Sequence, residues 1–340
     1  MEDRAPLTRE QAHELMQEIL AAQFSDLELA ALLGATAARG ETAAELAGFV
    51  DSMRAAVLPL PLTQAERSIL VDTCGTGGDA SGTFNISTAA ALVASAAGAS
   101  VAKHGNRAVT SRCGSADVLE ALGIPVTLTP PEAADALREH RFAFLHAPSL
   151  HPAMKAVMPV RRALGFRTVF NVLGPLTNPA GAAAQVMGVY AAHLVPLVAE
   201  AMALLGTRHA FVVHGESGTS SGGLDEISIS GPTQLAEIRT APGSKSTVAL
   251  RTISPEQFGL RRAPVEALAG GDADINAGIL SEIFAGEAGP RRDVVLLNAA
   301  AVLVTAGLAP DLSTGIRLAA ETIDQGRVTE LLGQLTRTSQ

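Results

Sequence analysis

The chain has 340 residues and a formal net charge of −9, with 47 % hydrophobic residues, no Trp and a single Tyr. This acidic balance argues against proteins that coat nucleic acid or bind an anionic membrane surface, because both require a basic face. The length favours one large and one small domain. Cys74 and Cys113 are too few for a disulfide framework, so two reduced thiols are favoured over a disulfide between them.

The N-terminal sequence MEDRAPLTRE contains acidic residues and lacks the apolar segment of a secretory signal peptide. No stretch reaches membrane-spanning length without a charge or a glycine. We therefore expect a cytoplasmic protein that binds neither membranes nor nucleic acid.

Residues 1–66 read as a small helical unit. Three helix starts show the capping-box pattern, in which Ser or Thr is followed three residues later by Glu or Gln, at Thr8, Ser25 and Thr42. Gly34 and Gly40 are expected to end the second helix or its tail. Alternating Pro and Leu over residues 58–62 predict a linker.

From residue 69 onward, apolar runs typical of strands alternate with helical patterns, which predicts a parallel sheet with crossover helices. The expected strands cover residues 69–71, 125–128, 142–145, 185–190 and 209–213. The expected helices include 131–141, 193–205, 292–308 and a single amphipathic helix over 313–335. Residues 230–253 read as an antiparallel excursion.

The predicted fold class is α/β, with a small all-helical domain plus a larger α/β domain that has a mostly parallel central sheet flanked by helices. The helical domain is expected over residues 1–66 and is completed by about 166–196. The α/β domain takes residues 67–165 and 197–340.

Three loops within residues 71–123 have the features of an anion site. GTGGD (75–79) follows a predicted strand, NIST (85–88) opens an Ala-rich helix, and KHGNR (103–107) follows another short apolar run. Glycines allow close backbone approach, and helix starts present free N–H groups to phosphate. Neither GxxxxGK[ST] nor GxGxxG occurs here, so a nucleotide held by a P-loop is not expected. Cationic side chains are added by Lys103, His104, Arg107 and Arg112.

Asp225 and Glu226 are adjacent carboxylates that follow a polar, Ser/Gly-rich loop after a predicted strand. Mg²⁺ takes one or two carboxylates and completes its coordination with phosphate oxygens and water. An isolated Asp-Glu pair is more often an ordinary acidic turn, so the pair alone leaves both interpretations open.

The order and spacing of GTGGD, NIST, KHGNR and GSAD resemble the anthranilate phosphoribosyltransferase family, as do RRALGFRTVFNVLGPLTNP and DEIS further along. The resemblance runs over nearly the whole chain. It implies transfer of the phosphoribosyl group of 5-phosphoribosyl 1-diphosphate (PRPP) to anthranilate, giving N-(5-phosphoribosyl)anthranilate and diphosphate, in tryptophan biosynthesis. It also implies a homodimer formed through the helical domain and two Mg²⁺ ions bound with the donor.

The same resemblance implies roles for particular residues. The metal ligands are Ser87, Asp225 and Glu226. The donor contacts are Gly75, Gly77, Gly78, Asp79, Thr83, Asn85, Ser87, Thr88, Lys103 and Ser115, with the 5-phosphate near the stretch after KHGNR. The anthranilate contacts are Gly75, His104, Gly105, Asn106, Arg161, Gly174 and Pro175. The fork of Arg161 suits the planar carboxylate, whereas Arg162 and Arg167 are given structural roles.

No residue is a firm general base. His104 is a catalytic candidate by position, and a histidine that only hydrogen-bonds substrate is an equal alternative. Residues 217–223 (SGTSSGG) lengthen the loop before the metal pair relative to the resembled family, which leaves the rigidity of that pair open.

Two other functions compete with this one. A pyrimidine nucleoside phosphorylase shares the two-domain fold but would lack the pairing of CGTGGD with KHGNR. A family member turned into a binding protein would have lost one of the motifs and gained a basic surface. The motifs are intact and the chain is acidic, so both alternatives are disfavoured.

Overall fold

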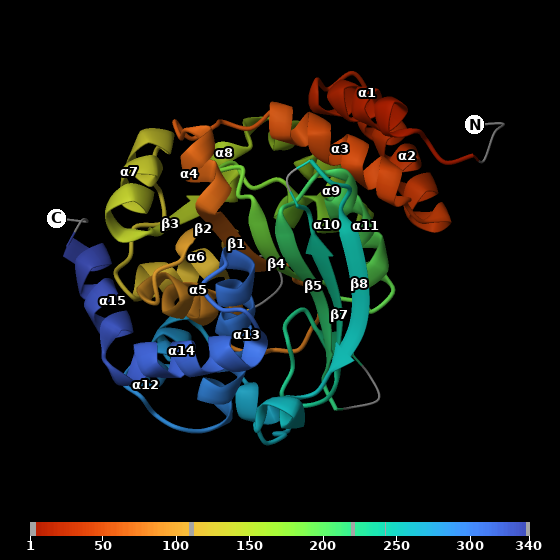
Figure 1. Ribbon diagram of the computed structural model, residues 1–340. Helices are drawn as coiled ribbons and strands as arrows, with labels where there is room; N and C mark the ends of the chain where they lie inside the picture. Colours follow the sequence, from red (N-terminus) through yellow and green to blue (C-terminus); the bar gives the residue numbers. More distant parts are fainter. Residues whose placement is uncertain (1–4, 109–111, 219–221, 242, 338–340) are drawn as a thin grey trace.

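The structure of the protein, a computed structural model, describes residues 5–108, 112–218, 222–241 and 243–337. The N-terminal helices α1 (Arg9–Leu20), α2 (Asp26–Arg39) and α3 (Ala43–Ala55) lie together at one end of the molecule (Figure 1). The extended segment at 58–62 then leads to α4 (Gln64–Ile69) and the sheet. The capping boxes at Thr8, Ser25 and Thr42 are confirmed, and Thr63 forms another at the start of α4.

Gly40 follows the last residue of α2 as expected, but Gly34 lies inside that helix and does not end it. A glycine within a helix costs about 1 kcal/mol relative to Ala. Here the side of Gly34 on which a side chain would stand faces Phe166, because a Cβ at Gly34 would lie 3.9 Å from Cζ of that residue. The glycine that was expected to end α2 therefore lies where the helix packs against a distant part of the chain.

The central sheet of the described residues has the strand order β3-β2-β1-β4-β5-β7-β8, with β6 paired to β5 off this path. The parallel strands are β1 (Leu70–Gly75), β2 (Ser100–Gly105), β3 (Phe142–His146), β4 (Ala184–Gly188) and β5 (His209–Glu216). The antiparallel strands are β6 (Gly223–Leu224), β7 (Thr233–Arg239) and β8 (Thr247–Ile253). The mostly parallel sheet and the antiparallel excursion are therefore confirmed.

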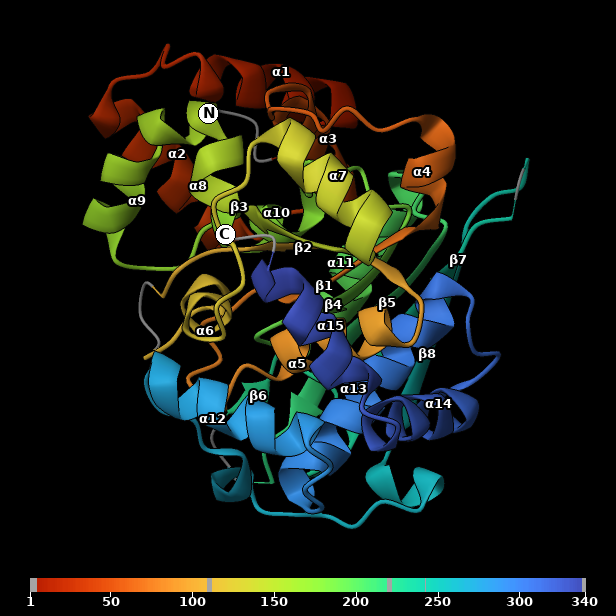
Figure 2. The same ribbon diagram turned by 90° about the vertical axis from the view of Figure 1, so that its left-hand side faces the viewer.

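Helices cover both faces of the sheet (Figures 1 and 2). Val186 and Phe211 point to a core that they share with α5 (Ile86–Ala96), α12 (Ala273–Phe284), α13 (Pro290–Ala306), α14 (Leu312–Asp324) and α15 (Arg327–Arg337). Met187 and Val212 point to a second core, shared with α11 (Leu194–Leu204) and the N-terminal helices. Successive strand residues face opposite sides, so β4 and β5 contribute to both cores.

The remaining helical segments connect these layers. α7 (Pro130–His140) packs on β3 through Ala133 and Leu137. The others are α6 (Ser115–Ala121), α8 (Ala147–Leu150), α9 (Met158–Leu164), α10 (Phe170–Leu176), and the 3₁₀ turns η1 (Pro152–Ala156), η2 (Pro255–Phe258) and η3 (Val265–Leu268).

Some local expectations are wrong. Residues 125–128 form no strand, because Pro125 has no N–H to donate to a sheet and Val126 is buried by packing alone. The expected single helix over 313–335 is two helices, since Gly326 adopts a left-handed φ of 71° between α14 and α15. The residues Lys103 to Gly105 belong to β2 and not to a loop.

The segment 166–196, assigned to the helical domain, contains β4, which pairs with β1 and β5 in the middle of the sheet. Its helix α10 does pack with the N-terminal helices, through Phe170 and Leu173. The division of the chain into domains otherwise stays a prediction. Cys74 and Cys113 are both buried. Within the described residues, no helix combines the length and apolar character needed to cross a membrane.

Candidate active site

The carboxyl ends of the parallel strands meet at one edge of the sheet. Gly75, the last residue of β1, is in register with Gly188 of β4, and Gly105 of β2 is in register with His146 of β3. Ligands of open parallel sheets bind at this edge. The fold thus brings GTGGD and KHGNR, which begin in the last residues of β1 and β2, to the same edge of the sheet.

The glycine loop after β1 is held by contacts from distant segments. Gly77 and Gly78 both have left-handed φ values, 68° and 77°, which glycine adopts without strain. The N–H of Gly77 donates to Oδ2 of Asp225 at 2.7 Å. Asp79 accepts from the N–H of Ser81 at 3.2 Å, and its other oxygen accepts from the N–H of Asp225 at 3.4 Å. The predicted donor loop and the predicted metal pair are therefore in direct contact.

Two glycines make this contact possible. A Cβ at Gly188 would lie 1.5 Å from the carbonyl oxygen of Asp225, and a Cβ at Gly75 would lie 2.0 Å from its Oδ2. Neither distance can be accommodated unless Asp225 moves. The segment is also held from the other side, because Asn298 of α13 accepts from the N–H of Ile227 and donates to its carbonyl oxygen.

Burial raises the pKa of Asp225 to about 7, and the charge of Asp79 adds to the effect. Burial, followed by the charge of Asp225, also raises the pKa of Glu226 well above its usual range. Oε1 of Glu226 accepts from the N–H of Ser87 at 3.0 Å. Two crowded carboxylates beside a serine hydroxyl form a hard oxygen donor set that a divalent cation would stabilise.

The donor set is incomplete by itself. No cluster of three or more His, Cys, Asp or Glu side chains suited to a metal ion occurs in the parts of the chain that the structure describes. Mg²⁺ uses few protein carboxylates and fills its remaining positions with phosphate oxygens and water. The residues present therefore fit Mg²⁺ that arrives with a phosphorylated ligand better than they fit a closed metal cage.

Lys103 lies beneath the start of α5. Its Nζ donates to the carbonyl oxygen of Thr73 at 2.7 Å and to Oγ of Ser87 at 3.2 Å. Burial lowers the pKa of Lys103, and the carboxylate of Asp72 opposes that effect. The amino group is thus held next to the predicted metal-binding serine, where its charge reaches the helix start.

The start of α5 carries unused polar groups. Oγ1 of Thr88 is buried and has no hydrogen-bond partner among the described residues. Asn85 precedes the helix but does not cap it, because its side chain bonds the carbonyl oxygen of Cys113 at 3.3 Å and the amide of Asn276 at 2.9 Å. Thr83 forms an isolated bridge with Ala269. A helix start with an unpartnered hydroxyl is suited to an anion.

The region predicted to meet the 5-phosphate is described in part. Ser115 begins α6, and its Oγ donates to the carbonyl oxygen of Asn106 at 3.2 Å. Residues 109–111 of the stretch after KHGNR lie outside the described residues. Residues 219–221 of the Ser/Gly loop do so as well. Arg107 does not face this region as an unpaired cation, because it pairs with Asp117 at 3.1 Å and with Glu120 at 2.8 Å.

His104 is buried beside a second histidine that our sequence analysis did not assign. The two Nε2 atoms of His104 and His151 are 3.2 Å apart, and the centres of their rings are 5.0 Å apart. Burial, together with the charge of His151, lowers the pKa of His104 to about 3, and burial lowers the pKa of His151 to about 4. Both rings are therefore neutral at neutral pH. The carbonyl oxygen of Gly174 contacts His104, which joins two predicted anthranilate contacts.

Arg161 differs from the other predicted arginines in its surroundings. Its guanidinium lies 5.3 Å from the centre of the Phe170 ring and contacts the sulfur of Met158 at 3.8 Å. Burial lowers the pKa of Arg161. No Asp or Glu pairs with it among the described residues. A partly buried cation without a carboxylate partner is suited to the carboxylate of a ligand.

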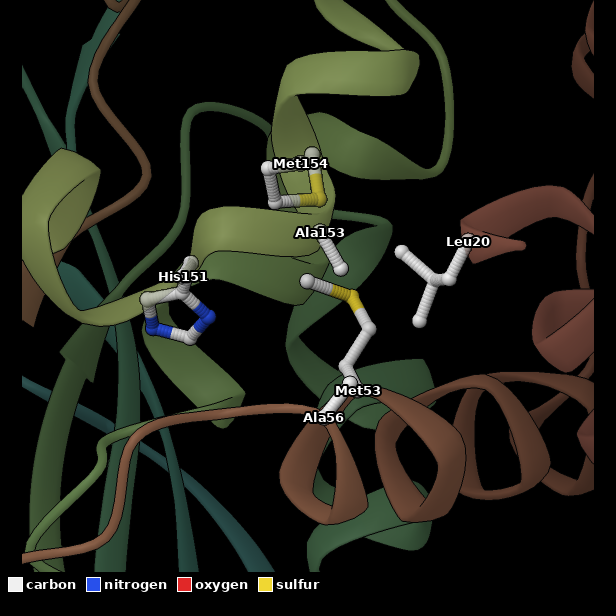
Figure 3. A pocket seen from close by; sticks show the side chains of 6 residues that line it. All are labelled: Leu20, Met53, Ala56, His151, Ala153 and Met154. Carbon is white, nitrogen blue, oxygen red and sulfur yellow. The ribbon is translucent and has the colours of Figure 1, made fainter. Parts of the chain in front are cut away.

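A small pocket lies beside His151, between the N-terminal helices and η1 (Figure 3). It measures about 10 Å³, which is room for about one water molecule. An aromatic ring enters it only if the surrounding side chains move. The pocket is lined by Leu20, Met53, Ala56, His151, Ala153 and Met154.

Sequence reasoning missed several residues that support the site. Asp72 accepts from the N–H of His104 at 3.1 Å and from Nε2 of Gln185 at 3.3 Å. Gln185 also donates to the carbonyl oxygen of Pro175 at 2.7 Å. A polar residue inside an otherwise apolar strand was the available signal for both Asp72 and Gln185. For His151, only its place in the His-Pro dipeptide pointed to a special position.

Comparisons with known proteins agree with this geometry. Residues 67–329 match the family described as "Glycosyl transferase family, a/b domain", and residues 2–57 match "Glycosyl transferase family, helical bundle domain". The chain is 48 % identical over 334 residues to an anthranilate phosphoribosyltransferase of Desulforamulus reducens, covering 98 % of this chain and 93 % of that one. It is 50 % identical over 322 residues to the enzyme of the same name from Brevibacillus brevis, covering 95 % and 91 %.

Solved structures show the same similarity. The crystal structure of anthranilate phosphoribosyltransferase from Thermus thermophilus is 43 % identical in sequence, with a TM-score of 0.88 over 98 % of this chain and 96 % of that chain. The enzyme of this name from Saccharomyces cerevisiae, in complex with PRPP and Mg, is 28 % identical, with a TM-score of 0.84 over 98 % and 93 %.

Proposed function

The chain belongs to the anthranilate phosphoribosyltransferase family, and from this premise we propose how its residues carry out the reaction. The protein transfers the phosphoribosyl group of PRPP to anthranilate in tryptophan biosynthesis. The observation that supports the assignment of roles is the contact between the glycine loop and the acidic pair, with Lys103 and Ser87 beside them. The histidine pair adjoins the same strands through Asp72, and Arg161 has no Asp or Glu partner among the described residues.

The donor occupies the glycine loop and the start of α5. Its diphosphate is held by the backbone N–H of Gly78, by the hydroxyl of Thr88 and by the charge of Lys103. The N–H of Gly77, which donates to Asp225, joins these contacts as Asp225 turns toward the metal. The other donor contacts are Gly75, Asp79, Thr83, Asn85, Ser87 and Ser115. Thr88 supports this role because a buried hydroxyl without a partner is costly unless a ligand completes its bonding.

Asp225, Glu226 and the hydroxyl of Ser87 would hold Mg²⁺. The ion would supply positive charge against the diphosphate. The hydrogen bonds that Asp225 and Glu226 accept from Gly77 and Ser87 place both carboxylates directly against the donor-binding backbone. We further propose, from the family resemblance, that two ions bind with the donor.

Anthranilate lies against the neighbouring surface formed by Gly105, Asn106, His104, Gly174 and Pro175, with Gly75 at the boundary to the donor. Arg161 binds the carboxylate through its fork. A pKa of about 3 makes His104 a weak base, so we assign it a hydrogen-bonding role. Asp72 orients it through the backbone N–H.

The chemistry follows from this placement. The bond between C1 of the ribose and the diphosphate oxygen breaks, the amine nitrogen of anthranilate bonds to C1, and the proton that the amine loses passes to the released diphosphate. The protein contributes mainly by holding the two reactants in line and by stabilising charge on the leaving diphosphate. Such a reaction requires no nucleophilic side chain, because the amine of anthranilate is itself the nucleophile.

The first test is the loss of anthranilate fluorescence on mixing protein, PRPP, anthranilate and Mg²⁺. We expect the loss to require all four components and to stop when a chelator is added. No loss, with PRPP still bound by calorimetry, would indicate another acceptor or a binding protein.

A second test isolates the acceptor site. Arg161→Ala should raise the KM for anthranilate far more than the KM for PRPP, whereas Arg162→Ala, on an exposed position of the same helix, should change neither. Equal increases in both KM values for Arg161→Ala would refute the carboxylate role.

We also propose a cytoplasmic homodimer formed through the helical part. Leu27 on α2 is 81 % exposed, and Phe166, which lies against that helix, is 49 % exposed. Large apolar side chains at such exposure are suited to a subunit contact. The chain has only two cysteines, too few for a disulfide framework, which supports a reducing compartment. Light scattering should give twice the chain mass for the wild type and a lower mass for Leu27→Glu; a monomeric wild type would refute the dimer.

A further inference from the structure

Arg167, for which the sequence predicted only a structural role, reaches the glycine loop from the turn between α9 and α10. Its Nη2 donates to the carbonyl oxygen of Gly78. Its guanidinium also lies over the ring of Tyr190, 4.0 Å from the ring centre. The side chain is exposed, and among the described residues no Asp or Glu forms an ion pair with it. A hydrogen bond and a ring contact, and not a neutralising carboxylate, therefore fix its position.

Tyr190 is attached to the same loop. Its N–H donates to Oγ1 of Thr76 at 3.0 Å, and the N–H of Thr76 donates to the carbonyl oxygen of Gly188 at 3.0 Å. Arg167 and Tyr190 therefore form a pair that contacts the loop both before and after Gly77. A planar guanidinium can stack on a ring and donate at its edge at the same time, which a lysine ammonium cannot do.

The direction of the bond from Arg167 matters for a ligand of the loop. In a planar trans peptide the carbonyl and the following N–H point in opposite directions. With the carbonyl oxygen of Gly78 bound to Arg167, the N–H of Asp79 points away from Arg167. The bond thus sets the orientation of one of the peptide groups that line the proposed diphosphate site.

The other main contact of the loop involves a proposed metal ligand. The N–H of Gly77 donates to Oδ2 of Asp225, and a carboxylate that turns to a cation gives up part of that bond. The contacts made by Arg167 and Tyr190 involve no proposed metal ligand. They are able to hold the loop in both the metal-free and the metal-bound protein.

We propose that Arg167 is a positioning residue for the phosphoribosyl donor: with Tyr190 it fixes the peptide after Gly78 so that the loop receives the diphosphate already ordered. This inference rests on the proposed donor site. It assigns Arg167 to the donor, although it lies six residues from Arg161, which is assigned to anthranilate. The turn between them also lies against the helical part, since Phe166 faces Gly34 of α2.

The test compares Arg167→Ala, Arg167→Lys and the control Arg162→Ala. Initial rates are measured with PRPP and anthranilate varied separately, and PRPP binding is measured by calorimetry without Mg²⁺ and with it. Arg167→Ala should raise the KM and the Kd for PRPP about tenfold, the loss of about 1.4 kcal/mol expected for one charge-assisted bond with its ring contact. The KM for anthranilate and the melting temperature should stay within the range of the control.

Arg167→Lys should recover only part of the affinity, because it restores the charge but not the fork and the stacking. The weaker PRPP binding should appear without Mg²⁺ as well as with it. Unchanged PRPP affinity in Arg167→Ala, full recovery in Arg167→Lys, or equal increases in both KM values would each overturn the proposal. If the wild type binds no PRPP at all, the proposed donor site fails and the inference fails with it, so the two failures are distinguishable.

The single tyrosine offers an independent readout of the contact. The chain has no Trp and one Tyr, so ultraviolet titration of the phenol reports on Tyr190 alone. Burial raises the pKa of Tyr190, and the charge of Arg167 opposes that effect. Arg167→Ala should therefore raise the phenol pKa further, and Arg162→Ala should not. An unchanged phenol pKa in Arg167→Ala would refute the stacked arrangement.

Discussion

Replacing His151 by Gln should remove about half of the acid sensitivity that the histidine pair gives to the fold. His104 and His151 are both buried, and burial is the first cause of their low pKa values of about 3 and about 4. In the unfolded chain each titrates near its ordinary pKa of about 6.5. Below that pH the unfolded chain binds protons that the folded chain does not, so the free energy of unfolding falls as the pH falls.

The magnitude follows from the two pKa values. Between pH 7 and pH 5, each histidine lowers the free energy of unfolding by about 2 kcal/mol, because about 1.4 kcal/mol is lost per pH unit over roughly 1.5 units below the unfolded pKa. The pair together accounts for about 4 kcal/mol by the same linkage. The loss ends only below the folded-state pKa values, near pH 4 for His151 and near pH 3 for His104.

Other groups change stability over the same range. Asp225 and Glu226 have raised pKa values, so protonating them at lower pH favours the folded state and opposes the histidine effect. The wild-type curve alone therefore cannot isolate the histidines. The comparison of a variant with the wild type at two pH values cancels these shared contributions.

The assay is urea unfolding of the wild type, His151→Gln and the control His193→Gln at pH 7 and pH 5. Gln is neutral at both values and keeps a polar group beside His104. The drop in unfolding free energy should be about 2 kcal/mol smaller for His151→Gln than for the wild type. His193 is exposed at the start of α11, and its variant should follow the wild type. An identical drop in His151→Gln would refute the buried, neutral pair.

Further outcomes follow from the same contacts. Gly188→Ala places a Cβ against the backbone of Asp225. It should lower the unfolding free energy by about 1–3 kcal/mol and weaken Mg²⁺-dependent transfer. Unchanged Mg²⁺ binding, measured by calorimetry in the presence of PRPP, would contradict the contact. Asn298→Ala leaves the N–H and the carbonyl of Ile227 without their partner, so denaturant unfolding should show a loss of about 2–4 kcal/mol; a loss below about 1 kcal/mol would contradict it. Arg107→Gln should leave the KM for PRPP unchanged, because Arg107 pairs with acidic side chains of α6; a large increase would restore the phosphate role suggested by the sequence.

The elements predicted best are those whose signals are local. Each expected capping box needs one hydroxyl and one Glu or Gln three residues apart, and all of them form. The prediction of a strand at 125–128 was wrong because an apolar residue such as Val126 indicates burial, and burial occurs in loops as well as in strands. Gly34 failed for a related reason, since the segment that packs against it is more than one hundred residues away and contains Phe166.

The motifs indicated which residues form the candidate site, but not which of these residues contact each other. The contact between Gly77 and Asp225 spans 148 positions of sequence, and no spacing rule links the two. The need for Gly188 is equally hidden, since only the path of Asp225 past that strand explains why a side chain is excluded there. The sequence therefore proposes which residues matter, and the fold shows which of them touch each other.

The arginines show why the remaining part could not be predicted. Arg107, Arg161 and Arg167 are alike in sequence, since each lies in a segment that resembles the family. Their partners separate them: Arg107 is neutralised by Asp117 and Glu120, whereas Arg161 and Arg167 face rings and, for Arg167, a backbone oxygen. A cation already neutralised adds little to the binding of an anion, because surface pairs compete with the ligand for the same donors. Of these three arginines, Arg161 and Arg167 have no carboxylate partner in the part of the chain that the structure describes. They are therefore the ones expected to distinguish the substrates, Arg161 for the acceptor and Arg167 for the donor.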